Sequence, residues 1–75
     1  MRISYDPEVD ALFVQLRDAP AAEGIDIEDG VTVAVDEAGH IVGLEVLDAR
    51  QRLGVDALDS VTVERLTGEP TQLGS

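Results

Sequence analysis

The sequence predicts a mainly β, small α+β fold: an antiparallel hairpin plus a three-strand meander, five to six strands in all, with one short helix near residues 49–53. Aliphatic residues alternate with other residues through most of residues 3–47, which is the period of a half-buried strand. Turn-forming residues separate the alternating segments. A chain of 75 residues is long enough for one domain with one core.

The first two strands are expected to pair as a hairpin. Ile3 and Tyr5 flank a serine, and Asp6-Pro7 then favours a turn because proline fixes its own φ angle. Residues 11–16 alternate again, with Phe13 on the face opposite to the leucines and the valine. Because the connection is short, these two strands should be antiparallel neighbours.

Three further strands are expected to follow a loop at residues 17–22. Asp29-Gly30 is a pair that supplies positive φ angles in a tight turn, and Gly39 is the expected left-handed residue of the next turn. Two short turns between three strands predict a meander. Its strands are expected at residues 25–28, 31–35 and 41–47.

The alternation stops at Asp48, where a short helix is expected. Asp48 has the residue type of an N-cap, and Gly54 has that of a helix stop. Arg50 and Arg52 would lie near the carboxyl end, where the helix dipole favours cations.

The segment 56–66 is compatible with a helix or a strand. Val61-Thr62-Val63 favours a strand by β-branching, and we predict a strand here. The domain is expected to span residues 1–66, followed by a disordered tail at residues 67–75. The helical alternative would use a stripe formed by Ala57, Leu58, Val61 and Leu66.

The expected core is aliphatic, and it lies on one face of the sheet. A chain this small gains little stability from a sheet with a bare apolar face, so we expect a homodimer that covers this face or pairs an edge strand. The inward-facing residues are expected to be Ile3, Tyr5, Leu12, Val14, Leu16, Ile25, Ile27, Val31, Val33, Val35, Val42, Leu44, Val46 and Leu53.

Composition restricts the classes of partner. Sixteen acidic residues against five arginines give a formal net charge of −11, which repels phosphate backbones and anionic membranes. We therefore expect no direct nucleic-acid binding and no membrane association, whereas a basic protein partner is favoured. The chain has no cysteine and one histidine, which excludes disulfides and an ordinary zinc cage. No apolar run approaches the ~18 residues of a membrane span, so the cytoplasm is the expected location.

Acidic residues gather at three of the expected turns. Such groups can coordinate Ca²⁺ or Mg²⁺, and a buried carboxylate pair can act as acid and base. Turn positions provide neither burial nor a cleft, so we interpret these groups as turn-forming or solvated, and His40 as a solvated turn residue without a nucleophile beside it. We predict no catalytic residue, no cofactor and no metal site. The groups are Asp6, Glu8 and Asp10; Asp26, Glu28 and Asp29; and Asp36 and Glu37 with His40.

One mixed-charge group remains as a candidate interaction surface: Glu45, Asp48, Arg50 and Arg52. It could bind a partner or a carboxylate ligand through its arginines. The alternative is structural: pairs between Glu45 and the arginines, together with a cap from Asp48, would fix the corner between the last strand and the helix.

Two sequence blocks resemble a known family. They are residues 1–12, which include Tyr5-Asp6-Pro7-Glu8 before Asp10-Ala11-Leu12, and residues 43–53, which begin Gly43-Leu44-Glu45-Val46-Leu47-Asp48-Ala49. Together they resemble the bacterial and archaeal domain-of-unknown-function family 2283, over residues 1 to about 54. The resemblance implies a small standalone β-rich domain with no assigned activity and no catalytic residues to carry over. Family genes near small toxin-like reading frames suggest an antitoxin-like role.

Two hypotheses of function follow. The first is a non-catalytic protein-interaction module, antitoxin-like in one form, whose acidic surface engages a basic partner. The alternative is a domain that binds a small ligand or a divalent metal, or a minimal enzyme, with its site at a homodimer interface.

Overall fold

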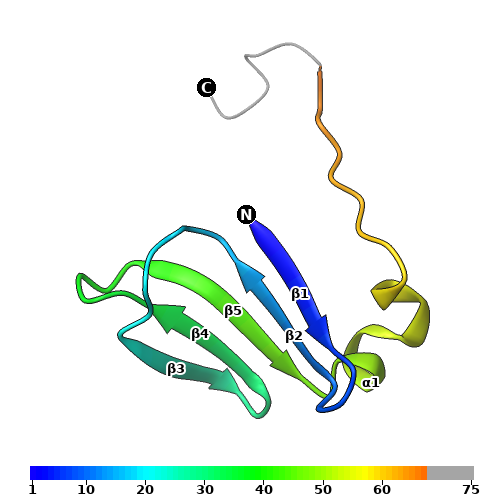
Figure 1. Ribbon diagram of the computed structural model, residues 1–75, viewed down its shortest axis with the longest axis horizontal. Helices are drawn as coiled ribbons and strands as arrows, with labels where there is room; N and C mark the ends of the chain where they lie inside the picture. The colour runs from blue at the N-terminus through cyan, green and yellow to red at the C-terminus, as the bar shows by residue number, and fades with distance from the viewer. Residues whose placement is uncertain (68–75) are drawn as a thin grey trace.

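Five strands form one antiparallel sheet in the computed structural model, which describes residues 1–67 (Figure 1). Their order across the sheet is β1-β2-β5-β4-β3. The mainly β prediction is therefore confirmed. The strands are β1 (Arg2–Asp6), β2 (Ala11–Gln15), β3 (Glu23–Glu28), β4 (Val31–Val35) and β5 (Ile41–Leu47).

The hairpin and the meander are both present, but the sheet order is not sequential. β1 pairs with β2, and β3, β4 and β5 pair in turn. The two units join because β2 pairs with β5, which places Leu12 opposite Val46 and Val14 opposite Leu44. The loop at residues 16–22 carries the chain from β2 across to the far edge, so that β1 and β3 become the two edge strands.

The register gives the sheet two chemically different faces. The first, which we call the inner face, is apolar on the four strands β1, β2, β5 and β4. The second, the outer face, carries polar and small residues together with Phe13. Across the inner face run Ile3, Tyr5, Leu12, Val14, Leu44, Val46, Val31, Val33 and, on β3, Ile25; across the outer face run Ser4, Phe13, Glu45, Thr32 and Asp26.

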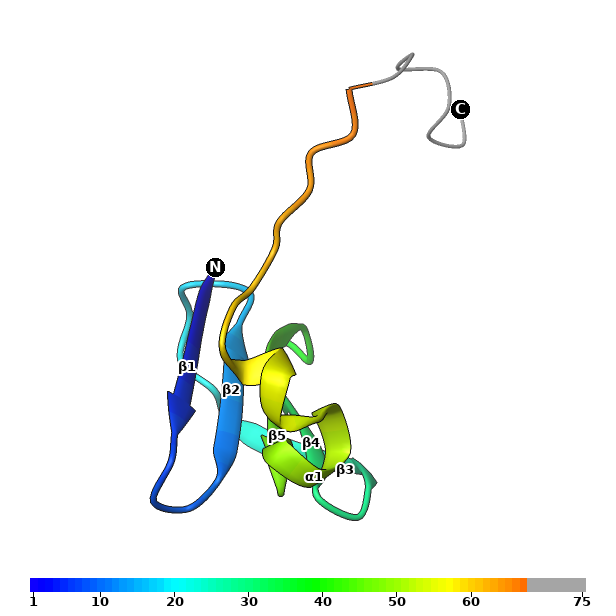
Figure 2. The ribbon, with the colours of Figure 1, turned by 90° about the vertical axis from the view of Figure 1, so that its right-hand side faces the viewer.

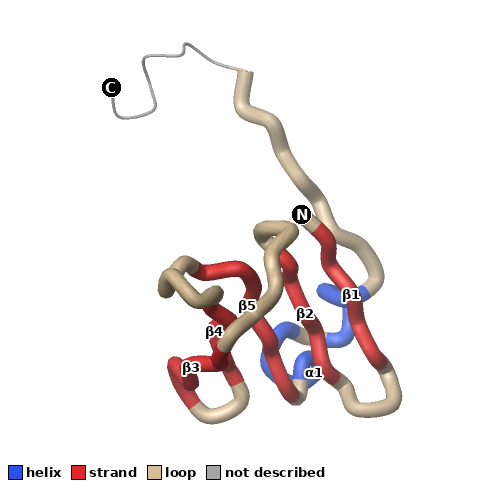
Figure 3. The backbone as a smooth tube through the Cα atoms, turned by 60° about the vertical axis from the view of Figure 1, so that its left-hand side comes forward, coloured by secondary structure: helices blue, strands red, loops and turns tan. Residues whose placement is uncertain are grey.

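Two helical turns follow β5 on the side of the inner face (Figure 2). They are α1 (Ala49–Leu53) and the 3₁₀ helix η1 (Val55–Leu58). The predicted helix near residues 49–53 is thus confirmed. The strand predicted within residues 56–66 is wrong, because η1 occupies its start and residues 59–67 have no regular secondary structure (Figure 3). β-branched residues favour a strand only when a neighbouring strand completes the ladder.

The core is small for the number of apolar residues. In residues 1–67 the buried apolar side chains are Val35, Val42, Val46 and Ala49. Other members of the predicted inward set remain accessible, and Ile25 is 46% exposed and Leu53 46% exposed. The inner face is therefore only partly covered by α1 and η1.

Two findings bear on the remaining sequence predictions. Within residues 1–67, no helix is sufficiently long and apolar to cross a membrane. The predicted disordered tail, residues 67–75, lies outside the described residues apart from Thr67.

Candidate interaction surfaces

Asp10 connects the first turn to the start of α1. Its backbone is left-handed, with φ 55°, and its carbonyl oxygen accepts a hydrogen bond from the Ala49 N–H at 3.0 Å. Its carboxylate accepts the Tyr5 hydroxyl at 2.6 Å and the Arg50 backbone N–H at 3.1 Å. The Arg50 Nε atom lies 3.5 Å from the same carboxylate. Asp10 thus satisfies two of the free N–H groups at the start of α1.

These contacts shift two pKa values in opposite directions. The hydrogen bond from the Tyr5 hydroxyl lowers the pKa of Asp10 below its ordinary value, because it stabilises the charged carboxylate. The same hydrogen bond raises the pKa of Tyr5, since a proton shared with a carboxylate is harder to remove. The pair is therefore held as a neutral phenol beside a carboxylate.

Asp48 does not cap α1 through its side chain. It occupies the N-cap position, but its φ angle is 53° and its side chain makes no capping hydrogen bond. A side-chain oxygen reaches the N2 or N3 amide from an N-cap residue in the extended region, not from a left-handed one. The capping predicted for Asp48 is therefore wrong, and Asp10 supplies a side-chain acceptor from the turn between β1 and β2.

Arg52 ties α1 to the turn between β3 and β4. Its Nε atom donates to the Leu47 carbonyl at 3.0 Å, and its Nη1 atom donates to Glu28 at 2.9 Å. Its Nη2 atom also donates to the Asp29 carbonyl. The guanidinium thus fixes α1 against the end of the sheet.

Glu45 lies apart from the other members of the predicted mixed-charge group. It sits on the outer face of β5, where Phe13 and Thr32 are its cross-strand neighbours. The two arginines of the group instead pair with Asp10 and Glu28 on the inner-face side. The structure therefore separates Glu45 and Asp48 from the ion pairs of Arg50 and Arg52, and the predicted Glu45–arginine pairs are wrong.

A shallow groove of 350 Å³ lies on the outer face, and we call it the outer groove. Its floor is made of small residues, and the Phe13 ring forms one side. A Cβ atom built on Gly43 would lie 2.6 Å from the Phe13 ring, so the ring lies directly over this glycine. The exposed carboxylate of Glu45 lies on the rim, whereas Glu23 pairs with Val35 and alternates with Gly24, so its side chain belongs to the inner face. The lining residues are Phe13, Ala21, Ala22, Glu23, Gly24, Thr32, Ala34 and Glu45.

A second groove, of 540 Å³, lies on the inner face, and we call it the inner groove. The β1–β2 hairpin forms one wall, and α1, η1 and the segment after η1 form the other. Most of its lining is apolar. The lining residues are Met1, Ile3, Tyr5, Leu12, Val14, Leu53, Ala57, Leu58, Asp59, Ser60, Val61 and Val63.

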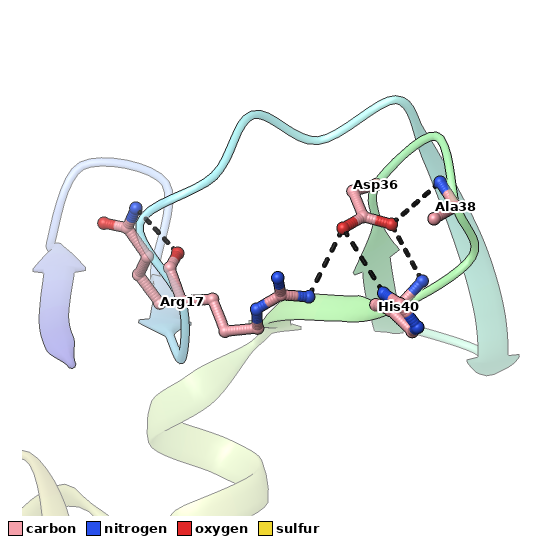
Figure 4. A network of polar contacts seen from close by, with 5 residues as sticks. Arg17, Asp36, Ala38 and His40 are labelled. Atoms are coloured by element: carbon pink, nitrogen blue, oxygen red, sulfur yellow. Dashed lines mark hydrogen bonds and ion pairs between the residues drawn. The ribbon is translucent and has the colours of Figure 1, made fainter.

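Asp36 organises the turn between β4 and β5 (Figure 4). It accepts the backbone N–H groups of Ala38 at 3.0 Å and of His40 at 2.8 Å. Arg17 donates to it at 3.3 Å, and the His40 ring lies 3.9 Å from it. The amide of His40 contributes most to lowering the pKa of Asp36. This acidic group therefore stabilises the turn, as predicted.

Each of the other two acidic groups also contains a residue that makes a local structural contact. Asp6 accepts the Glu8 backbone N–H at 3.0 Å, the turn contact that was predicted for it. Asp26 accepts the Thr32 hydroxyl at 2.9 Å. Residues 1–67 contain no group of three histidine, cysteine or acidic residues arranged to hold a metal ion.

The Tyr5–Asp10–Arg50 cluster is the arrangement that sequence reasoning missed. Tyr5 and Asp10 flank one short turn, so their proximity could have been expected. The contact with Arg50 spans 40 positions and depends on β2 pairing with β5. No local pattern gives that pairing.

These features define a class of protein: a small β-rich domain with helical turns on one face of its sheet and a groove on each face. The family model described as "Protein of unknown function (DUF2283)" matches residues 2–50, and the chain belongs to this family. The resemblance noted from the two sequence blocks is thereby confirmed.

The chain is also similar to an uncharacterised protein of Methanocaldococcus jannaschii, MJ0789. The two are 36% identical over 59 residues, which cover 79% of this chain and 50% of the archaeal protein. The match therefore spans about half the length of that relative. The comparison with solved structures gave no match.

Proposed function

We propose that this chain is a non-catalytic protein-interaction module of the cytoplasm, whose outer face binds a basic protein. The observation that carries the proposal is the outer groove, in which the exposed carboxylate of Glu45 lies beside the Phe13 ring. The antitoxin-like role implied by the family resemblance is one form of this function, in which the chain would hold a basic protein in a neutral complex.

The chemistry of the outer groove suits an arginine or lysine side chain. Glu45 offers a carboxylate, which binds guanidinium groups through charge-assisted hydrogen bonds. The face of the Phe13 ring attracts a cation placed over it. The small residues of the floor, such as Gly24 and Ala34, leave room for the aliphatic part of the chain.

The charge of the whole chain supports the same class of partner. A net charge of −11 on 75 residues attracts a basic protein over a distance of about one Debye length, roughly 8–10 Å at physiological salt. Such steering raises the rate of association and suppresses acidic partners. The outer groove then provides the short-range contact.

The test uses a fluorescent peptide of alternating arginine and alanine, with its affinity measured by anisotropy. We expect the variant E45Q to bind roughly 1.4- to 5-fold more weakly, because an exposed charge pair contributes roughly 0.2–1 kcal/mol. The matched control E8Q removes the same charge away from the outer groove. An equal loss in the control would show that only the overall field attracts the peptide, and would contradict the proposal.

A second candidate function is binding of a small apolar ligand in the inner groove, at a homodimer interface. The volume of 540 Å³ favours it, because ligand pockets measure roughly 300–1,000 Å³ and are mostly apolar. Nile red, a neutral apolar dye, is a suitable probe. A rise in its fluorescence that is lost in L53D would support this candidate, and no rise would oppose it.

A further inference from the structure

We propose that two copies of this chain exchange residues 59–66, which we call the arm. The arm of each copy adds as a strand beside β1 of the other and places Val61 and Val63 over the partner's inner face. This self-association uses the face opposite to the outer groove, so it is independent of the proposed function.

The inner face is only partly covered by α1 and η1, and its residues on the four strands β1, β2, β5 and β4 carry no charge. Its residues on β1, β2, β5 and β4 include no acidic residue, although the chain has sixteen. Ile3 is 37% exposed, and Ile25 on β3, which pairs with β4, is 46% exposed. A contiguous apolar surface beside a small core is typical of a face that another polypeptide covers.

β1 is an edge strand, and its side away from β2 is open to pairing. Within residues 1–67, β2 is its single neighbour in the sheet. An edge strand presents a row of unpaired N–H and C=O groups, which is a template for an added strand. Because Ile3 points to the inner face, a strand added here would bring its own inward-facing residues against the inner groove.

The arm has the sequence of a strand but pairs with no strand among the described residues. Val61 and Val63 line the rim of the inner groove but remain 60% and 74% exposed, and the arm then continues past the N-terminus (Figures 1 and 2). Val61 and Val63 would lie on one face of an added strand, with Thr62 and Glu64 on the other. The apolar pair then matches the inner face, and the polar pair matches the outer face.

The length of the arm fits the edge. Eight extended residues span about 26 Å at about 3.3 Å each, whereas the five residues of β1 span about 17 Å. The arm therefore covers the whole of β1 with residues to spare for the crossing between copies.

We assign a second copy of this chain as the partner, because the chain carries both the arm and the edge strand to which the arm would bind. Each copy offers an arm and an open β1 edge, so one two-fold axis satisfies both arms and closes the assembly. Charge supports this choice. A copy with a net charge of −11 is repelled by carboxylate-bearing surfaces and can approach best across the apolar strands of the inner face, whereas a basic partner is drawn to the outer groove.

Cysteine trapping tests the exchange, since the natural chain has no cysteine. The double variants I3C/V61C and I3C/V63C place one thiol on β1 and one on the arm. Under mild oxidation we expect at least one of them to give a covalent dimer of twice the 8.0 kDa chain mass. The control I3C/A38C, with its second thiol at a distant turn, should give far less. A bridge within one chain, running as a monomer, would overturn the proposal.

Light scattering on the full chain gives a second readout. We expect a dimer at micromolar concentration for the natural sequence and a monomer for V61D/V63D, which circular dichroism should show to remain β-rich. The matched control S60D/T62D adds the same charge on the other side of the arm and should stay dimeric. A monomeric natural chain, or a V61D/V63D variant that remains a dimer, would overturn the proposal. E45Q should leave the mass unchanged, which separates this inference from the proposed function.

Discussion

Asp10 and Asp48 are both non-glycine residues with positive φ angles, yet they contribute differently. Asp10 accepts hydrogen bonds from Tyr5 and from the Arg50 amide, whereas Asp48 makes no side-chain cap. Both backbones suit glycine, so substitution by glycine isolates the side chain in each case.

We expect D10G to lower the urea midpoint of unfolding clearly, because the start of α1 and the Tyr5 hydroxyl lose their acceptor. D48G should remain within about 1 kcal/mol of the natural chain, because glycine relieves the left-handed backbone while adding flexibility to the unfolded chain. Equal midpoints for the two variants would show that Asp10 does not hold α1 to the first turn.

Tyr5 is the one tyrosine of a chain without tryptophan, so phenolate absorbance reports on it alone. Its pKa is raised from 10.0 by the hydrogen bond to Asp10. A raised folded-state pKa gives stability that is fully present below pH 10.0 and is lost as pH rises through the folded value. We expect D10N to lower the absorbance midpoint towards 10.0. The control E8Q should not move it, and an unchanged midpoint in D10N would refute the assignment.

At the scale of the element, β5 depends on Gly43 for close contact with β2. A Cβ atom there would lie 2.6 Å from the Phe13 ring and 3.0 Å from the Val14 carbonyl oxygen. We expect G43A to destabilise the fold by about 1–3 kcal/mol, as overpacking generally does, measured by chemical denaturation. In an F13A background the cost should fall. A G43A variant as stable as the natural chain would mean that the ring moves aside freely.

The strands and short turns were predictable because they follow from local chemistry. Alternating aliphatic residues placed β1 to β5, and Asp29-Gly30 and Gly39 marked turns whose glycines have φ angles of 87° and 85°. The pairing of β2 with β5 was not predictable, because it depends on which face the two units share. Asp10 was misread for the same reason: its helix partner lies 40 positions away.

The segment after η1 shows how propensity depends on context. Val61-Thr62-Val63 has the composition of a strand, and the structure gives it none of the ladder bonds that a strand needs. Under the proposed exchange, the sequence-based strand would form only in the dimer.

At the scale of the whole molecule, the two proposed contacts should respond to salt in opposite directions. Two chains with charges of −11 repel each other, so added salt should tighten the homodimer. The same salt should weaken binding of the arginine–alanine peptide, which is attracted by that charge. Sedimentation and anisotropy measured in one salt series would test this. A homodimer that weakens with salt would point to ion pairs, not apolar burial, at its interface.

β3, the edge strand opposite to β1, determines whether the sheet can extend into a larger assembly. β3 carries Glu23, Asp26 and Glu28, all of its residues are exposed, and its pairing with β4 is irregular between Asp26 and Glu28. Negative charge and an irregular ladder both discourage a further strand from docking. A fibre grows only if both edge strands of every subunit can pair with a further strand. The charge and the irregular ladder of β3 oppose such pairing at this edge. Chains of this kind should therefore resist amyloid formation even at high concentration.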